Sequence, residues 1–225
     1  MPNWCYTHFT FHGTESEIYH FRDKIEEWTS KTFTETSFGE TWLGNILYGV
    51  GLEDRIDLGR DNPMNIRCRG SLTFLDTEDD IRGRNNCCKF TLSTETAWCP
   101  MITMWIETIK KLGYKTIGFS YQAEESGVGL YEVYDPYGDY PEKYYADVYL
   151  DDEDIDDPKI RILTDDPYIN SDKEMVEILQ ELLGSSKTDV DDLIYEAESE
   201  YPFKCRSESY IEIHKFEPAN PMWWV

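Results

Sequence analysis

The chain has 225 residues and a mass of 26.5 kDa. Its residues are 40% hydrophobic and 15% aromatic, which is enough to form a sizeable core and excludes wholesale disorder. Its 45 acidic and 21 basic residues give a net charge of −24 at pH 7. Direct nucleic-acid binding is therefore disfavoured, because neutralising phosphates requires a basic surface.

The chain opens with a predicted strand and a predicted helix. Residues 4–12 alternate between apolar and polar side chains, which is strand periodicity. Thr14 and Glu17 have the spacing of a capping box, and apolar residues then recur at helical spacing at Ile18, Phe21, Ile25 and Trp28. A strand followed by a capped helix is typical of the start of a βαβ unit.

The next hundred residues predict a sheet with a second helix. After a weak stretch at 31–61, with a short helix or an insert at 42–50, strand signals return at 64–69 and 72–75, and 87–98 predicts a long strand. Pro100 suits the first turn of a helix over 102–112, which Gly113 ends. Strands at 116–121 and 130–134 form a hairpin around a glycine-containing connection. This order favours a two-layer α+β sandwich with helices on one face of a mainly antiparallel sheet.

The last third is strongly acidic but still patterned. Residues 124–200 contain 25 acidic and 5 basic residues. Ser171 caps a predicted helix over 171–183, and either Thr188 or Asp189 opens another that reaches 197. A last strand is predicted at 209–216, and the apolar end at 218–225 is expected to dock on the fold. We therefore expect an α+β domain at 1–135 and an acidic α-rich α+β extension at 136–225, packed on the first domain.

Three short motifs in the first domain resemble a known family. They are Met1-Pro2-Asn3-Trp4-Cys5 at the start, Glu95-Thr96-Ala97-Trp98-Cys99-Pro100 before a helix, and Tyr121-x-x-Glu124-Glu125-x-Gly127. In combination they resemble the ferredoxin-like domain of the YubB-type accessory proteins carried by phages, plasmids and gut bacteria, over about residues 1–135. The resemblance implies an elaborated ferredoxin-like βαββαβ core and a mobile-element or gut-bacterial source. It implies no catalytic residues.

Several familiar sites fail on spacing. No secretory signal pattern precedes the six cysteines and no C-x-x-C pair occurs, so we expect reduced thiols, a cytoplasmic protein and no zinc site. No apolar run approaches the ~18 residues of a membrane span. An EF-hand aligned from Asp152 has Asp157 where glycine is needed and Leu163 where glutamate is needed. Gly127 and Gly129 lack the rest of a phosphate loop. We expect no metal and no cofactor.

The acidic third suggests a non-enzymatic interaction protein. A folded anionic surface can attract a basic partner, such as a nucleic-acid-binding host or defence protein, by resembling the charge of DNA. The alternative is that the charge serves solubility alone. The predicted partner-binding residues share a carboxylate in the acidic segment: Asp151, Asp152, Glu153, Asp154, Asp156, Asp157, Asp165 and Asp166.

A competing hypothesis is a small enzyme or ligand-binding domain with a cleft lined by Trp98, Glu124 and Glu125. A pocket with converging polar groups would favour it. The tyrosine-rich stretch at 131–145 is either a recognition surface or a loop packed over the sheet.

Overall fold

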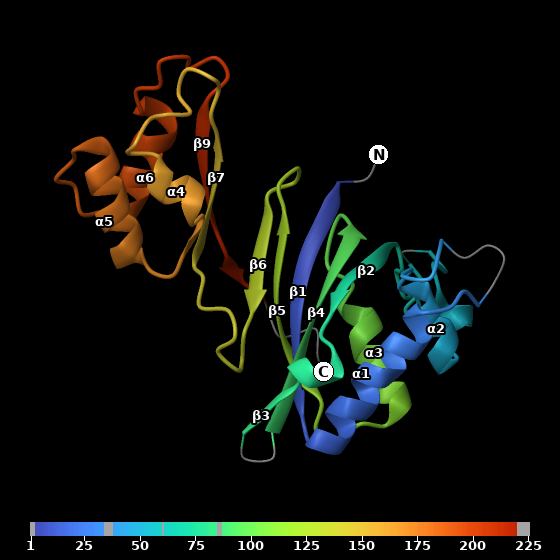
Figure 1. The fold of residues 1–225 in the computed structure, drawn as a ribbon. Helices are drawn as coiled ribbons and strands as arrows, with labels where there is room; N and C mark the ends of the chain where they lie inside the picture. Colours follow the sequence, from blue (N-terminus) through green and yellow to red (C-terminus); the bar gives the residue numbers. More distant parts are fainter. Residues whose placement is uncertain (1–2, 34–37, 60, 85–86, 220–225) are drawn as a thin grey trace. The chain divides into compact units, whose positions relative to one another are not determined.

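The computed structural model describes residues 3–33, 38–59, 61–84 and 87–219. The fold is mixed α+β, with six α-helices in this part of the chain and mostly antiparallel sheets (Figure 1). The chain divides into two compact units, one formed by residues up to 140 and from 219 onward, the other by residues 141–218. The second unit is thus an insertion near the end of the first.

The first unit is a sheet covered by helices. Its strands lie in the order β6-β5-β1-β4-β2, with β3 paired to β4, and all these pairings are antiparallel. The strands are β1 (Trp4–Gly13), β2 (Gly70–Leu75), β3 (Arg82–Arg84), β4 (Cys87–Ala97), β5 (Gly118–Glu125) and β6 (Leu130–Tyr134). The helices are α1 (Glu15–Thr29), α2 (Gly44–Val50) and α3 (Ile102–Leu112), with short 3-10 turns at Glu53–Arg55 and Glu78–Asp80.

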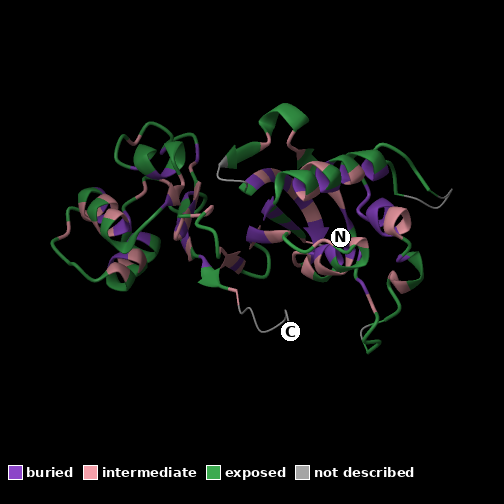
Figure 2. Cartoon of the chain, turned by 90° about the horizontal axis from the view of Figure 1, so that it is seen from below, coloured by how far each residue is buried: buried purple, intermediate pink, exposed green. Residues whose placement is uncertain are grey.

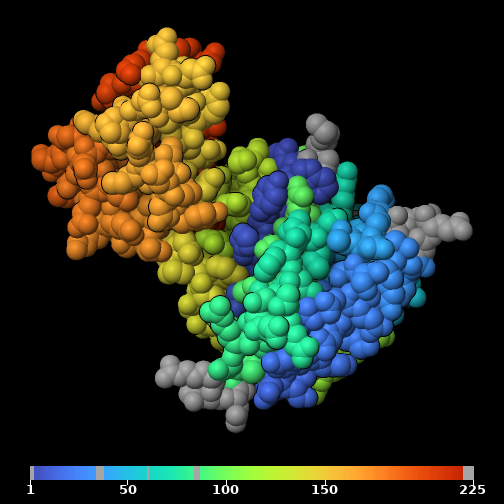
Figure 3. All heavy atoms as spheres, viewed as in Figure 1, coloured from blue at the N-terminus to red at the C-terminus, as the bar shows by residue number. Residues whose placement is uncertain are grey.

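Alternation along β1 decides which face of this sheet is covered. Phe9 and Phe11 are fully buried against the helices, and their rings meet Trp105 of α3 at 5.7 and 5.4 Å. Phe11 also stacks on Phe90 of β4 at 5.3 Å. The buried residues gather where the strands face the helices (Figure 2), and α1 and α2 form the adjoining outer surface (blue in Figure 3). Of the two alternatives at 42–50, a short helix or an insert, the structure has a helix over Gly44–Val50. The predicted helix at 102–112 is confirmed, and Gly113 ends α3 with φ +76°.

The predicted capping box before α1 is wrong. Thr14 makes no side-chain hydrogen bond to the helix, and its Oγ1 instead lies 3.2 Å from Thr116 Oγ1. The Glu17 carboxylate accepts hydrogen bonds from the backbone N–H groups of Lys115 and Thr116 at 3.0 and 2.9 Å. Both side chains therefore tie α1 to the approach to β5, and a tertiary contact replaces the local cap.

A loop at 136–140 covers one end of the opposite sheet face. The Asp135 carboxylate accepts from the N–H groups of Asp139 and Tyr140 at 2.8 and 2.9 Å. Asp139 then reaches His12 Nε2 at 2.6 Å and Lys89 Nζ at 2.7 Å. These contacts keep the loop with the first unit, so the division falls after residue 140 and not after residue 135. Tyr137 stacks on His12 at 4.1 Å and the Tyr140 hydroxyl lies 3.1 Å from Thr10 Oγ1, so these two tyrosines of the 131–145 stretch pack over the sheet.

The second unit has its own small core. Its sheet has the order β8-β7-β9, formed by β7 (Tyr144–Tyr149), β8 (Tyr168–Ile169) and β9 (Tyr210–Lys215), and β10 (Glu217–Pro218) follows. Its helices are α4 (Arg161–Asp165), α5 (Asp172–Leu183) and α6 (Val190–Glu200). Buried residues from both layers form one cluster that includes Tyr144, Leu179, Leu193 and Ile211. The acidic third is therefore folded.

Helix ends in this unit follow the sequence closely. Ser171 Oγ accepts from the Glu174 N–H at 3.2 Å, and Asp189 Oδ1 accepts from the Asp192 N–H at 3.0 Å. Asp189, and not Thr188, is thus the cap of α6. Gly184 ends α5 with φ +64°. The last strand lies at 210–215, close to its predicted range, whereas the predicted docking of 218–225 falls almost entirely outside the described residues.

Candidate functional site

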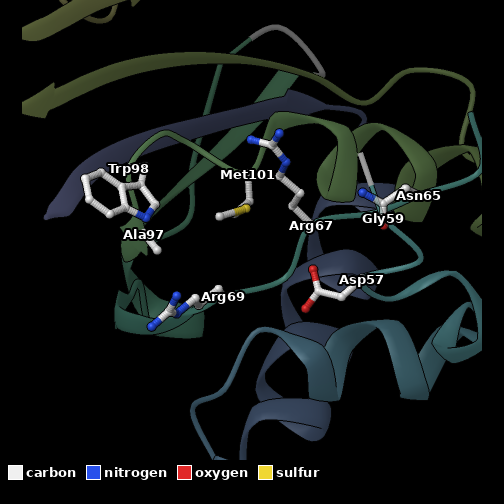
Figure 4. Close-up of a pocket in the computed structure, with 8 residues that line it drawn as sticks. All are labelled: Asp57, Gly59, Asn65, Arg67, Arg69, Ala97, Trp98 and Met101. Carbon is white, nitrogen blue, oxygen red and sulfur yellow. The ribbon is translucent and has the colours of Figure 1, made fainter. Parts of the chain in front are cut away.

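A pocket of about 310 Å³ opens beside the end of β4 in the first unit (Figure 4). Three segments line it: the loop at 57–59, the extended segment at 65–69, and the connection from β4 to α3 at 97–101. Figure 4 shows Trp98 and Arg69 on one side and Asp57 and Asn65 on the other, with Arg67 and Met101 between them. This volume suits a small organic ligand.

Two arginines reach the pocket because the segment before β2 is extended. Ile66 and Cys68 point inward and are buried, so the alternating side chains of Arg67 and Arg69 are exposed on the pocket side. The Ala97 N–H donates to the Arg69 carbonyl at 2.9 Å, which holds this segment against the end of β4. The predicted strand at 64–69 is wrong, since only Ile66 forms a bridge there.

Neither pocket arginine has an acidic partner in the described chain. The arginines that form ion pairs among these residues are Arg22 and Arg55. In a protein with 45 acidic and 21 basic residues, one pocket lined by two arginines without carboxylate partners among the described residues is unusual. Figure 4 shows their guanidinium groups at two separate places on the pocket wall, and each is available to an anion.

The pocket also concentrates backbone strain. Asp57 has φ 51° and Trp98 has φ 73°, and they are the only non-glycine residues with positive φ in the described part of the chain. Such a conformation costs roughly 1–3 kcal/mol and persists only where surrounding contacts enforce it. The Trp98 N–H donates to the Asn3 carbonyl at 3.0 Å, and the Asp57 N–H donates to the Ile66 carbonyl at 3.1 Å. Strain of this kind is concentrated at ligand and active sites.

An ion pair fixes the wall that carries Asp57. The Arg55 guanidinium binds the Glu107 carboxylate of α3 at 2.5 Å and donates to the Met64 carbonyl at 2.8 Å. Burial opposes ionisation of Glu107, but the hydrogen bond and charge of Arg55 hold the pKa of this carboxyl below its usual value. Arg55 therefore ties the backbone at Met64 to the helix layer.

A second hollow of about 390 Å³ adjoins the first and shares Asn65, Arg67 and Met101 with it. It extends to the first turn of α3, which no side chain of the described residues caps. Asn65 Oδ1 is buried and has no hydrogen-bond partner among the described residues. A ligand can supply the missing partner, with the amide in either of its two orientations.

The thiol beneath the pocket is not a nucleophile. Burial, and then the charge of Asp57, raises the pKa of Cys68 far above its usual value. Because the thiolate is the reactive form, Cys68 is chemically inert at neutral pH. Cys68 therefore adds no activated nucleophile to the pocket.

The structure brings one of the three residues of the predicted cleft to this pocket. Trp98 lines the pocket, whereas Glu124 and Glu125 do not. Glu125 is 3% exposed, and its carboxylate accepts from the N–H groups of Gly127 and Val128, each at 2.8 Å. Glu125 thus shapes the turn between β5 and β6, and Glu124 lies on β5 opposite Tyr131.

Three of the eight predicted partner-binding carboxylates hold the second unit together. Asp154 is 2% exposed and accepts from the Lys204 and Cys205 N–H groups at 2.7 and 3.2 Å. Asp151 is buried and accepts from two N–H groups of its own turn. Asp157 accepts from the Tyr201 hydroxyl at 2.8 Å. These groups are occupied internally. The remaining five are exposed: Asp152, Glu153, Asp156, Asp165 and Asp166.

No protein-family model, curated protein or solved structure matches the chain. No helix within the described ranges combines the length and apolar character needed to cross a bilayer. Because a fold alone does not define an activity, function has to be argued from the chemistry of the sites themselves.

Proposed function

We propose that the first unit binds a small anionic ligand in the pocket between Trp98 and Asp57. The observation that carries the proposal is that Arg67 and Arg69, neither paired with a described acid, line one pocket with Asp57 and Trp98, the two left-handed non-glycine residues in the described part of the chain. A guanidinium group binds carboxylate or phosphate oxygens through forked hydrogen bonds. The half-exposed Trp98 indole adds a flat surface for a ring, and Asp57 accepts from a donor on the ligand.

Isothermal titration calorimetry of the full chain tests this proposal, with phenyl phosphate and AMP as anionic probes and adenosine as the uncharged control. We expect one site for each anion and much weaker binding of adenosine. Arg67→Gln and Arg69→Gln should each weaken phosphate binding by about tenfold, which is about 1.4 kcal/mol.

The matched control is Arg161→Gln, which removes the same charge from an exposed position in the second unit. Its affinity for the anionic probes should equal that of the wild type. Equal affinities in the Arg67→Gln and Arg161→Gln variants would refute the proposal, as would an absence of phosphate binding to the wild-type chain.

We further propose that the first unit is an elaborated ferredoxin-like domain of the YubB type, from a mobile element or a gut bacterium. The strand order β5-β1-β4-β2 supports it, because a βαββαβ chain with fully antiparallel pairing produces this order. In that correspondence α1 and α3 are the two crossover helices, and α2, β3 and β6 are additions. The function of such a domain still depends on its pocket.

A second candidate function is recognition of a basic protein by the second unit in the cytoplasm. It is supported by the 23 acidic and 8 basic residues of 141–218, a net charge of −15, and by the five exposed carboxylates at 152–166. A histone-like DNA-binding protein is a suitable probe for the full chain. Binding should weaken strongly between 50 and 300 mM salt and in the combined variant Asp152→Asn, Glu153→Gln and Asp156→Asn. Salt-independent binding, or binding unchanged in that variant, would exclude this mode.

A further inference from the structure

Three potential metal ligands meet on the sheet of the second unit. The β7–β9 register places Asp147 directly opposite Glu212, and Tyr145 opposite His214. Ala146 of β7 and Ile211 and Ile213 of β9 are buried in the core. The three potential ligands alternate with these residues along the strands, so they lie on the other face of the sheet. One ligand atom from each of Asp147, Glu212 and His214 lies within 4.8 Å of the other two.

The charge arrangement is unfavourable without a cation. Directly opposed like charges on neighbouring strands destabilise a sheet, and this unit already has a net charge of −15. Among the described residues no lysine or arginine forms an ion pair with either carboxylate, and the one ion contact of Glu212 is with His214 Nε2 at 3.8 Å. Lys143, at the start of β7, pairs instead with Asp172 at 2.6 Å. Within the described ranges, no ion pair with a lysine or arginine relieves the repulsion between Asp147 and Glu212.

Aromatic rings frame the three ligands along the strands. The Tyr149 and Tyr210 rings stack at 5.9 Å on one side, directly after the Asp147–Glu212 pair. On the other side the His214 ring stacks on Tyr145, with centroids 6.4 Å apart and planes at 17°. The stacking holds the imidazole in a defined orientation, so one ligand of the site is already positioned for a cation.

We propose that Asp147, Glu212 and His214 bind one divalent transition-metal ion, with zinc as the best match. Two carboxylate oxygens and an imidazole nitrogen form a donor set that zinc accepts, at bond lengths of about 2.0–2.2 Å. Ligand atoms around such an ion lie about 3.3–3.6 Å apart, which small side-chain rotations reach from the observed separation. Magnesium is a poorer match, because it prefers six oxygen ligands.

The test is calorimetric titration of ZnCl₂ into the tag-free full chain, with MgCl₂ as the comparison ion. We expect one zinc per chain and at least about tenfold weaker binding in Asp147→Asn and in His214→Gln. Asp152→Asn and His20→Gln remove an exposed carboxylate and an exposed imidazole elsewhere, and they should bind zinc as the wild type does. Cobalt substitution should give visible absorption bands that disappear in His214→Gln.

Far-UV circular dichroism of every variant separates loss of the site from loss of the fold. The proposal is overturned if the wild type binds no zinc, if Asp147→Asn and Asp152→Asn bind it equally well, or if magnesium binds as tightly. The Arg67→Gln variant should keep full zinc affinity, so this site and the anion pocket fail or succeed independently.

Discussion

The left-handed backbone at Trp98 predicts that a glycine variant at this position is more stable than an alanine variant, which reverses the usual order of stability. Both Trp98→Ala and Trp98→Gly remove the indole, so the two variants lose the same packing and differ only in backbone freedom. Alanine must keep the φ of 73° that glycine adopts without steric penalty. At most positions alanine is the more stabilising of the two, because glycine gains more entropy on unfolding.

The magnitude follows from two opposing terms. Relief of the left-handed conformation is worth roughly 1–3 kcal/mol, and the extra unfolded-state entropy of glycine costs about 0.5–1 kcal/mol. We therefore expect the Trp98→Gly variant to be about 1 kcal/mol more stable than the Trp98→Ala variant. Asp23, at an exposed position inside α1, supplies the control, since there the alanine variant should be the more stable by about 1 kcal/mol.

Urea unfolding followed by circular dichroism measures the difference between each pair. With a urea slope of about 1–3 kcal/mol per molar, 1 kcal/mol moves the midpoint by about 0.3–1 M. An alanine variant at position 98 that equals or exceeds the glycine variant would show that the site stores no backbone strain. Neither variant should bind phenyl phosphate as tightly as the wild type, because both lose the aromatic wall of the pocket.

Three further outcomes follow from the contacts of the first unit. Burial opposes ionisation of Asp139, but hydrogen bonds from Lys89 and His12 hold the pKa of this carboxyl below its usual value, so its stabilisation is present above about pH 4 and is lost as the pH falls further. Asp139→Asn should cost about 1–2 kcal/mol at pH 7 and flatten urea midpoints between pH 4 and pH 2. Gly70→Ala should cost about 1–3 kcal/mol in the same assay, because the added Cβ would lie 2.4 Å from a backbone oxygen of β4. In a thiol-reagent titration at pH 8, the exposed Cys87 should react first, whereas burial raises the pKa of Cys5 to about 12 and protects it, with Cys68, until the chain unfolds.

Periodicity predicts the parts of this fold in which one face of an element is buried. Phe9 and Phe11 in β1, and the spaced apolar residues of α3, mark their core faces in the sequence alone. The sequence does not predict β7, because its buried Tyr144 follows closely on Pro136, Gly138 and Pro141, and this composition favours a loop. Its partner β9 begins more than sixty residues later, and no local pattern encodes that pairing.

The sites were harder to predict than the elements, for physical reasons. The alternation of Arg67 and Arg69 with apolar residues is a sequence pattern that indicates two exposed arginines on one face. The positions of Asp57 and Trp98 at the same pocket depend on tertiary contacts and on the left-handed backbone of these two residues, which no local pattern encodes. Acidic composition suggested a solvated segment at 151–157. Asp154 is instead buried, because its carboxylate satisfies backbone N–H groups more than forty residues away.

Salt should affect the anion pocket in the direction opposite to that of most anion sites. At 10 mM salt the screening length is about 30 Å, so a ligand at Arg67 and Arg69 is repelled by the acidic excess of the first unit, which has 22 acidic and 13 basic residues. At 150 mM the length is about 8 Å, and the two guanidinium groups then dominate what the ligand experiences. The affinity for phenyl phosphate should therefore hold or rise between these conditions, in calorimetric titrations of the wild-type chain.

Binding of a basic protein to the acidic surface of the second unit should show the opposite salt dependence. Its attraction to a basic protein acts over long range, so the same increase in salt should weaken that interaction. A fall of more than about threefold in the affinity for phenyl phosphate would contradict this reasoning. It would mean that the pocket attracts the anion over long range, which a protein with a large negative net charge cannot do. Opposite salt dependences of the two interactions would show that Arg67 and Arg69 bind the anion through direct contact. Such contact is expected, because both arginines are exposed in a protein whose net charge repels anions at longer range.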